Sequence, residues 1–383
     1  MTRSGAYVQQ LEGYKAFIPT PLPPNPPIRV DEEMLALLSK AYRSLGRLDG
    51  SIQASPNPLP NPDLFVFMYV KKEAVLSSQI EGTQASINDI LEAEANIFRS
   101  NQPNDIQEVI NYIAAMNLGR KKLTKLPMSI RLVKEIHARL MEGVRGNHLQ
   151  PGEIRQSQNW IGASGMSINS ATFVPPPPSA VMSALSDFEK FLHDPVPMPD
   201  LIKIGLAHAQ FETIHPFLDG NGRVGRLLII FLLCERGILT TPILYISHFF
   251  KAHRLEYYDR LQATRDHGDW EGWLKFFLKG VALVATQATD TFQNIVSLRV
   301  NYRQIIAAKF GRVGANGAIV LEEFFVRPIM SVNDVREILK VSYPAANGLM
   351  NKFVAHKMVE EITGQSRNRL FRFSSYINLF SEN

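Results

Sequence analysis

The chain has 383 residues, and its 45% hydrophobic and 20% charged content is that of a soluble globular protein with two or three domains. Its net charge of +5 is confined to residues 299–383, where 12 Lys and Arg stand against 7 Asp and Glu, so we expect an anionic partner such as nucleic acid only there. The longest apolar run, residues 227–234, is too short for a membrane span of ~20 residues, and its cysteine, Cys234, is the only one in the chain, so we expect a cytoplasmic protein without disulfides.

Helical periodicity dominates the first part of the chain. The opening residues end in a proline-rich segment, 19–27, which predicts an extended arm. A helix is predicted from Asp31 with acidic residues in its first turn, and residues 55–63 form a proline-rich loop before the next helix. Further helices are predicted over residues 106–123 and 129–144.

Residues 159–178 are the one convincing non-helical segment in the middle of the chain. Gly, Ser and Asn surround two short β-prone pieces, and four prolines end the segment, which predicts a hairpin. Helical patterns return over residues 179–194, 201–214, 223–235, 248–265 and 269–293. The fold is therefore expected to be mainly α.

The last part of the chain has a different rhythm. Three short helices are predicted over 318–325, 331–339 and 342–357, and residues 360–373 predict two strands around a turn with two arginines. This is the pattern of a small winged-helix domain, whose third helix can enter a major groove. That helix holds only Lys352, His356 and Lys357 as basic residues, so protein contact or dimerisation is the alternative. We expect three parts, 1–100, 101–295 and 296–383.

The segment SSQIEGT, residues 77–83, has a local interpretation. Ser78 and Glu81 have the spacing of a capping box, which would start a helix. The glycine that follows, Gly82, is unusual inside a starting helix, so a distant partner for the Glu81 carboxylate is the alternative.

Residues 215–226, HPFLDGNGRVGR, hold the densest group of chemically useful residues. Three glycines let the backbone turn tightly and approach a ligand, and they are Gly220, Gly222 and Gly225. Asn221 tolerates left-handed geometry and offers side-chain hydrogen bonds. Because an apolar helix begins at the end of this stretch, its free N–H groups and its positive dipole end would face a bound anion.

Four charged or titratable side chains complete the group. Arg223 and Arg226 are fork-shaped donors for phosphate oxygens. Asp219 is a hard carboxylate of the kind that Mg²⁺ uses between phosphates, and His215 can take a proton near neutral pH. The stretch therefore predicts a phosphate cradle with one metal ligand and one base. A transition-metal pair of His215 and Asp219 would lack a third ligand, and a glycine turn that only caps a helix leaves both arginines unexplained.

The same stretch resembles the signature of the Fic family, His-Pro-Phe-x-Asp/Glu-Gly-Asn-Gly-Arg-x-x-Arg, at every fixed position. The likeness extends over most of residues 60–290. Residues 159–178 are similar to the hairpin flap of the family, and residues 253–261 resemble the helix beyond its active site. The resemblance implies a Fic-type helical core with a β-hairpin flap, and protein adenylylation, the transfer of AMP from ATP to a Ser, Thr or Tyr hydroxyl of a target protein, including the chain itself.

The resemblance also implies roles for individual residues. His215 would be the general base, Phe217 would hold the loop and Asp219 would hold Mg²⁺ between the α- and β-phosphates. ATP would be bound by Gly220, Asn221, Gly222, Arg223, Gly225 and Arg226, with Asn221 on the α-phosphate, Arg223 on the β-phosphate and Arg226 on the γ-phosphate. Tyr257 and Tyr258 are weaker candidates for the adenine side. The flap, Ala171, Thr172, Phe173 and Val174, would pair with an extended target segment by strand addition.

Residues 77–82 match the family's inhibitory motif, Ser/Thr-x-x-x-Glu-Gly/Asn. The match implies that Ser77, Glu81 and Gly82 form an inhibitory element in which Glu81 pairs with Arg226 and displaces the γ-phosphate. A carboxylate suits this role because guanidinium binds carboxylate and phosphate with the same geometry.

Two other functions remain open. The chain could be a DNA-binding regulator with a Fic core that senses nucleotides, or a Fic enzyme with another donor or reaction, such as UMP or phosphocholine transfer, phosphorylation or AMP removal. The intact His215, Asp219, Arg223 and Arg226 favour catalysis over sensing. A homodimer is expected because it is common in similar proteins.

Overall fold

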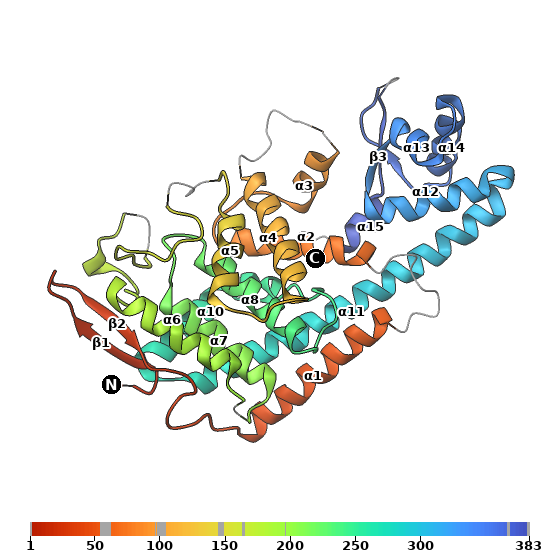
Figure 1. Cartoon of the computed structure of the whole chain (residues 1–383). Coiled ribbons are helices and arrows are strands. Elements are labelled where there is room, and N and C mark those ends of the chain that lie inside the picture. The colour runs from red at the N-terminus through yellow and green to blue at the C-terminus, as the bar shows by residue number, and fades with distance from the viewer. Residues whose placement is uncertain are drawn as a thin grey trace.

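The computed structural model describes residues 2–53, 63–95, 97, 105–144, 149–162, 165–195, 197–365 and 368–380, without the side chains of residues 63–65. The mainly helical fold predicted from the sequence is confirmed (Figure 1). The proline-rich loop predicted at 55–63 lies, up to residue 62, outside the described residues, as does the expected boundary between residues 100 and 101.

The elements follow one another in a simple order. The first half contains β1 (Gly5–Gln9), β2 (Lys15–Pro19), α1 (Glu32–Gln53), α2 (Asp63–Ile80), α3 (Ile87–Glu94), α4 (Ile106–Leu123), α5 (Ile130–Leu140) and the 3₁₀ turn η1 (Ile168–Ser170). The middle contains α6 (Pro178–His193), α7 (Asp200–Ile214), α8 (Asn221–Glu235), α9 (Ser247–Ala252), α10 (Arg254–His267) and α11 (Trp270–Lys309). The end contains η2 (Gly311–Val313), α12 (Gly314–Val326), β3 (Ile329–Ser331), α13 (Val332–Leu339), α14 (Tyr343–Ala355), β4 (Glu360–Glu361), β5 (Leu370–Arg372), α15 (Ser374–Ile377) and η3 (Asn378–Phe380).

Two helices, α7 and α8, form the centre of the fold. Every residue of α7 from Leu201 to Ile214 is buried, and the apolar run of α8 is buried up to Leu233. A helix that is apolar on all sides must be covered on all sides, and α2, α4, α5, α6 and α11 provide this cover. Cys234 packs against the same core, and burial raises the pKa of its thiol to about 12, so Cys234 is a core residue.

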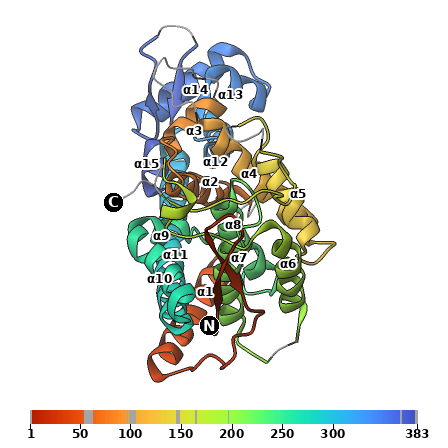
Figure 2. The ribbon, with the colours of Figure 1, turned by 90° about the vertical axis from the view of Figure 1, so that its left-hand side faces the viewer.

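The N-terminal residues differ from the predicted arm. β1 and β2 form an antiparallel hairpin with register from Gly5↔Pro19 to Gln9↔Lys15. The sequence did not predict this hairpin because its turn carries none of the Asn-Gly or Asp-Gly signals of a tight hairpin, whereas the described proline-rich segment after Pro19 contains no helix or strand up to α1. The hairpin lies against the core through β2 and α7, at the front in the view of Figure 2.

The hairpin predicted at residues 159–178 is much shorter than expected. A single antiparallel bridge joins Ile161 and Phe173, and η1 lies between its arms. Prolines 175–178 end the pairing because proline has no N–H to donate.

The C-terminal part contains the predicted three helices, α12, α13 and α14, and the two predicted strands, β4 and β5. A third strand that the sequence did not reveal, β3, completes an antiparallel sheet with the order β3-β5-β4. The helix α11 runs without a break past residue 295, so the boundary expected there stays a prediction. Among the described residues, none of the helices combines the length and apolar character needed to cross a bilayer.

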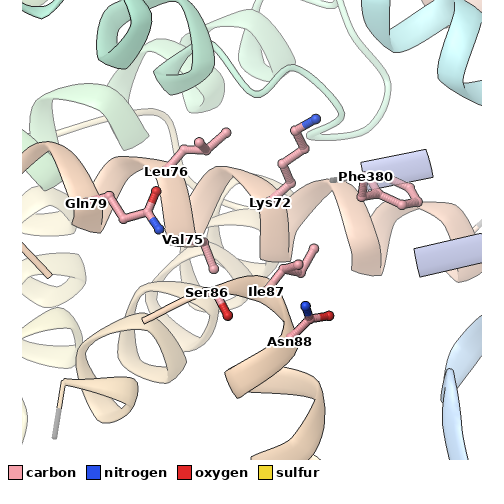
Figure 3. A pocket seen from close by; sticks show the side chains of 8 residues that line it. All are labelled: Lys72, Val75, Leu76, Gln79, Ser86, Ile87, Asn88 and Phe380. Atoms are coloured by element: carbon pink, nitrogen blue, oxygen red, sulfur yellow. The ribbon is translucent and has the colours of Figure 1, made fainter. Parts of the chain in front are cut away.

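The C-terminal end packs on helix α2. The ring of Phe380 meets the ring of Tyr69 edge-on at 5.2 Å between centroids, and Arg372 donates to the side chain of Asn88 over 2.7 Å. A cavity of about 250 Å³ lies between α2, the start of α3 and Phe380, with Gln79 at its edge (Figure 3). The end of the chain therefore supports the helix that carries the predicted inhibitory motif.

Candidate active site

The loop between α7 and α8 brings the predicted site together. His215 ends α7 in a left-handed conformation with φ of 49°, and Gly220 precedes α8 with φ of 77°. Both positions reverse the chain direction, and a residue without a β-carbon suits the second one. These two turns let a loop of only a few residues connect α7 to α8.

Side-chain amides hold the loop from inside. Asn221 accepts from the N–H of Phe217 over 2.9 Å and donates to its carbonyl over 2.8 Å. Asn159 donates to the same carbonyl over 2.8 Å, and the Phe217 ring is fully buried. The side chain of Asn221 is therefore engaged with the loop rather than pointing to the α-phosphate as the sequence predicted, and its backbone N–H remains for an anion.

Arg155 fixes the segment that carries His215, the candidate base. Its guanidinium donates to the carbonyls of His215 over 2.8 Å and Pro176 over 2.5 Å, and its own N–H donates to the carbonyl of Pro216 over 3.0 Å. The residue is 2% exposed. Arg155 thus joins the flap to the loop that begins at His215. No local sequence pattern predicted this role.

His137 supports the loop from the other side. Its ring stacks on Phe217 at 3.7 Å, and its Nδ1 accepts the N–H of Gly152 over 2.8 Å. Because Nδ1 accepts, Nε2 carries the proton of the neutral ring and donates to the carbonyl of Asp219 over 3.0 Å. Burial lowers the pKa of His137 to about 4, so this tautomer persists at neutral pH.

His215 is neutral at physiological pH. Burial, and then the positive charges of Arg265 and Arg155, lower the pKa of its imidazole to about 3. A neutral imidazole can accept a proton, which an imidazolium cannot. The structure therefore presents His215 in the form that a general base needs.

The first turn of α8 is an anion site that holds a carboxylate. The N–H groups of Asn221, Gly222 and Arg223 precede the first intrahelical bond, from Val224 to Gly220. A β-carbon on Gly222 would lie 2.3 Å from Oε1 of Glu81, so only glycine lets this carboxylate come so near. Glu81 therefore stands where the helix N-terminus attracts negative charge.

Arg226 joins α8 to the end of α2. Its Nη2 lies 2.6 Å from Oε1 of Glu81 and 2.9 Å from the carbonyl of Ser77, and its Nε donates to the Ser77 hydroxyl over 2.8 Å. Burial disfavours the charged Glu81, but Arg226 outweighs burial and lowers the pKa of the carboxyl. The contact predicted between residues 81 and 226 is thus present as an ion pair.

The end of α2 corrects the capping interpretation. Ser77 and Ser78 lie inside the last turn of α2, which ends at Ile80, so Ser78 does not start a helix. The capping box belongs to Ser86 and Asp89 at the start of α3. Gly82 has φ of 99° after the end of α2, which explains why glycine follows Glu81.

Arg223 has a buried partner that sequence reasoning missed. Its Nη1 lies 2.9 Å from Oε2 of Glu108 on α4, and both side chains are less than 10% exposed, at 3% and 6%. Asp219 lies 3.8 Å from the other end of the guanidinium and accepts the N–H of Gly220 over 2.6 Å. Arg223 is thus held at the rim of the anion site by one carboxylate on each side.

Two predicted ATP contacts belong to the core instead. A β-carbon on Gly225 would lie 2.1 Å from Oε1 of Glu212, so this glycine makes room for a neighbouring side chain. Tyr257 is 1% exposed and shares its hydroxyl hydrogen bond with His208 over 2.8 Å, so its assignment to the adenine side was wrong. Tyr258 beside it is 38% exposed and remains the candidate.

The residues present fit a magnesium ion bound together with phosphates. Among the described residues no cluster of three or more His, Cys, Asp or Glu could hold a metal by itself. Asp219 keeps a side chain that is 42% exposed at the mouth of the anion site. Mg²⁺ commonly uses one or two carboxylates plus phosphate oxygens and water, so one carboxylate suffices.

Known proteins resemble the chain over these same segments. Residues 35–121 match a family model described as Fic/DOC family N-terminal, and residues 127–233 match the Fic/DOC family model. A protein of Aquifex aeolicus (strain VF5), named as a probable protein adenylyltransferase, is 32% identical over 196 residues, which are 50% of this chain and 56% of that protein. Protein adenylyltransferase Fic of Aedes aegypti is 33% identical over 178 residues, 44% of this chain and 31% of that protein. The chain thus covers only 31–56% of the length of these relatives.

The fold also has a close structural counterpart. A crystal structure of a Fic family protein from Desulfovibrio desulfuricans G20 matches with a TM-score of 0.59 at 19% sequence identity, over 91% of this chain and 97% of that one. This likeness shows the same fold over nearly the whole chain.

Proposed function

Residues 35–233 place this chain in the Fic/DOC family, and we propose that it is a protein adenylyltransferase held inactive by its own Glu81. The observation that carries the proposal is the ion pair at 2.6 Å between Glu81 and Arg226, at the N-terminus of α8. An anion site that contains an internal carboxylate implies an external anion with which that carboxylate competes.

The chemistry follows from the positions of the residues. The hydroxyl oxygen of a target side chain attacks the α-phosphorus of ATP, the bond from that phosphorus to the bridging oxygen of pyrophosphate breaks, and the hydroxyl proton passes to neutral His215. Negative charge grows on the phosphate oxygens, where the N–H groups of Gly222 and Arg223 are already oriented. Removing one such oriented donor typically costs about 2.7–4 kcal/mol of transition-state stabilisation.

Asp219 is the residue that would hold Mg²⁺ in this reaction. The ion supplies positive charge that stabilises the phosphates when it is bound. Arg223 would bind the β-phosphate after releasing Glu108 or Asp219. Arg226 would bind the γ-phosphate after Glu81 moves away. The target would pair with the flap, Ala171, Thr172, Phe173 and Val174, by strand addition.

We propose protein contact rather than DNA binding for the C-terminal winged-helix-like part. Lys352, the one basic residue within α14 as the structure bounds it, donates to the carbonyl of Phe310 over 3.0 Å. Arg369 of the wing donates to Asn347 and Asn351, and Arg372 donates to Asn88 of α3. Basic groups that bond inside the protein contribute less to phosphate contacts. Affinity for DNA falls with salt in proportion to the number of phosphate contacts, so weak binding of duplex DNA that hardly changes with salt concentration would support protein contact.

The proposal is tested by incubating the Glu81→Gly variant with Mg²⁺ and ATP that carries the label on the α-phosphate, alone and with cell lysate. We expect covalent label on proteins, and none with the Glu81→Gly, His215→Ala double variant. No label with the single variant would contradict the proposed function.

A further inference from the structure

The N-terminal hairpin and the flap border one groove of about 460 Å³. The hairpin lines one wall of this hairpin–flap groove with Tyr7, Gln9 and residues 13–15, and residues 168, 169 and 171–174 line the other, beside Gln262 and Asp266 of α10. Among the described residues one backbone hydrogen bond joins the two walls, in which the N–H of Phe17 donates to the carbonyl of Val174 over 2.9 Å, and the ring of Phe17 lies 6.0 Å from that of Phe173 between centroids. The pairing stops there, and the groove opens away from it.

The β2 wall presents an open strand edge. The bonds from Gln10 to Tyr14 at 2.8 Å and from Thr20 to Ser4 at 2.9 Å fix which residues of β2 pair with β1. Hydrogen-bonded pairs alternate in an antiparallel ladder, so the N–H and carbonyl of Lys15 point away from β1, as those of Phe17 do. Lys15 faces Gln9 in a non-hydrogen-bonded pair, and among the described residues its backbone groups make no hydrogen bond outside the β1–β2 ladder.

The flap wall presents a second open edge. Phe173 exchanges two hydrogen bonds with Ile161, of 2.8 and 3.1 Å, so its neighbours Thr172 and Val174 point to the opposite side. The carbonyl of Val174 is the acceptor for Phe17 on that side. Thr172 is exposed, and its backbone groups make no hydrogen bond within the described part of the chain.

The groove is lined mainly by polar residues and lies near the loop that carries the candidate base. Tyr14, Ala16 and Val174 form a small buried cluster beneath it. Beside Phe173, which lines the groove, the guanidinium of Arg265 stacks on the ring at 3.7 Å, and Nε of the same arginine lies 3.3 Å from the hydroxyl of Thr213. Thr213 is two residues before the candidate base, so the groove adjoins the reaction site.

We propose that the hairpin–flap groove binds an extended segment of the protein that accepts AMP, paired on one side with Thr172 and on the other with Lys15. Two facing edges of unpaired N–H and carbonyl groups complement an extended polypeptide, whose main chain offers the same groups on both sides. The hairpin thus forms a second wall of the target site, and it binds the target mainly through main-chain hydrogen bonds. This inference rests on the proposed function.

The test compares proline with alanine at the same position. Lys15→Pro and Lys15→Ala both remove the side chain, but only proline removes the N–H that points into the groove, and neither changes a bond between β1 and β2. Both are made in the Glu81→Gly chain. The substrate is the best peptide from an array of randomised short peptides, each with one central Ser, Thr or Tyr.

We expect the KM for the peptide to be about three- to tenfold higher for Lys15→Pro than for Lys15→Ala, the effect of one lost backbone hydrogen bond, with the KM for ATP unchanged. Thr172→Pro against Thr172→Ala serves as the positive control for the flap. Ala171 has φ of −63° and ψ of 144°, the conformation that a residue before proline prefers. Equal peptide KM values for the two Lys15 variants would overturn the inference.

Hydrogen exchange gives a second test without a hairpin variant. In the Glu81→Gly, His215→Ala chain, which binds without turnover, a saturating amount of the same peptide should slow exchange at the amides of Lys15 and Thr172 together. Protection at Thr172 alone would reduce the site to the flap and overturn the role of the hairpin. A Glu81→Gly chain that transfers no label from ATP to any peptide or to itself would overturn the proposed function as well.

Discussion

Removal of the Glu81 carboxylate is the perturbation whose effect the structure determines best. Its partner Arg226 is 1% exposed, while the Glu81 side chain is 33% exposed. A hydrogen bond between charged groups contributes about 1.5–3 kcal/mol, and the exposure of Glu81 places this pair at the lower end through solvent screening. Since about 1.4 kcal/mol corresponds to a factor of ten, we expect Glu81→Gly to raise the transfer rate about ten- to thirtyfold.

The assay measures the initial rate of label transfer from ATP labelled on the α-phosphate, with Glu81→Gln as an intermediate variant that keeps the shape and loses the charge. Glu94→Gln is the matched control, because it removes the ion pair between Glu94 of α3 and Lys71 of α2 and leaves Arg226 untouched. Unfolding curves show whether each variant keeps its fold. Equal rates for wild type and Glu81→Gly, with both chains folded, would refute the competition between Glu81 and phosphate.

Three further outcomes follow from the core around the site. Gly225→Ala should lower the free energy of unfolding by about 1–3 kcal/mol in denaturant titrations, because its β-carbon would overlap Glu212, and an unchanged value would contradict this packing. Burial raises the pKa of Glu212 to about 7, so the folded chain binds more protons than the unfolded chain between the usual carboxyl pKa and pH 7. The wild type should therefore lose stability relative to Glu212→Gln as the pH rises through that window, with no further change above it, in unfolding curves recorded across the range. Tyr258→Ala should raise the KM for ATP several-fold in transfer assays, whereas Tyr257→Phe should leave it unchanged and instead destabilise the chain through the lost bond to His208.

The residues that lie next to one another in the sequence were the ones that could be predicted. Within residues 215–226, the turn glycine Gly220, the candidate base His215 and the two arginines must lie close together to act on one anion. Their spacing in the sequence therefore indicates their chemistry. The pairing of Glu81 with Arg226 could be predicted because a resemblance supplied the partner. The spacing in the chain alone favoured a capping box, which the end of α2 excludes.

Partners that meet only through tertiary packing could not be predicted. Glu108, His137 and Arg155 are far from the loop in sequence and reach it from α4, from α5 and from the segment after α5. Tyr257 and Tyr258 are adjacent residues of the same type, so the sequence does not tell them apart. The orientation of α10 about its axis decides which of them faces the core. The β1–β2 hairpin was missed for another reason, since its turn lacks the residues that mark tight hairpins.

The position of the label on ATP tests the central claim most directly. The Glu81→Gly chain is incubated with Mg²⁺ and ATP labelled either on the α-phosphate or on the γ-phosphate, and the protein is then separated and counted. Adenylylation predicts that covalent label appears only from the α-labelled nucleotide and disappears when His215 is also replaced by alanine. Label that comes from the γ-phosphate, or that persists without His215, would contradict the account.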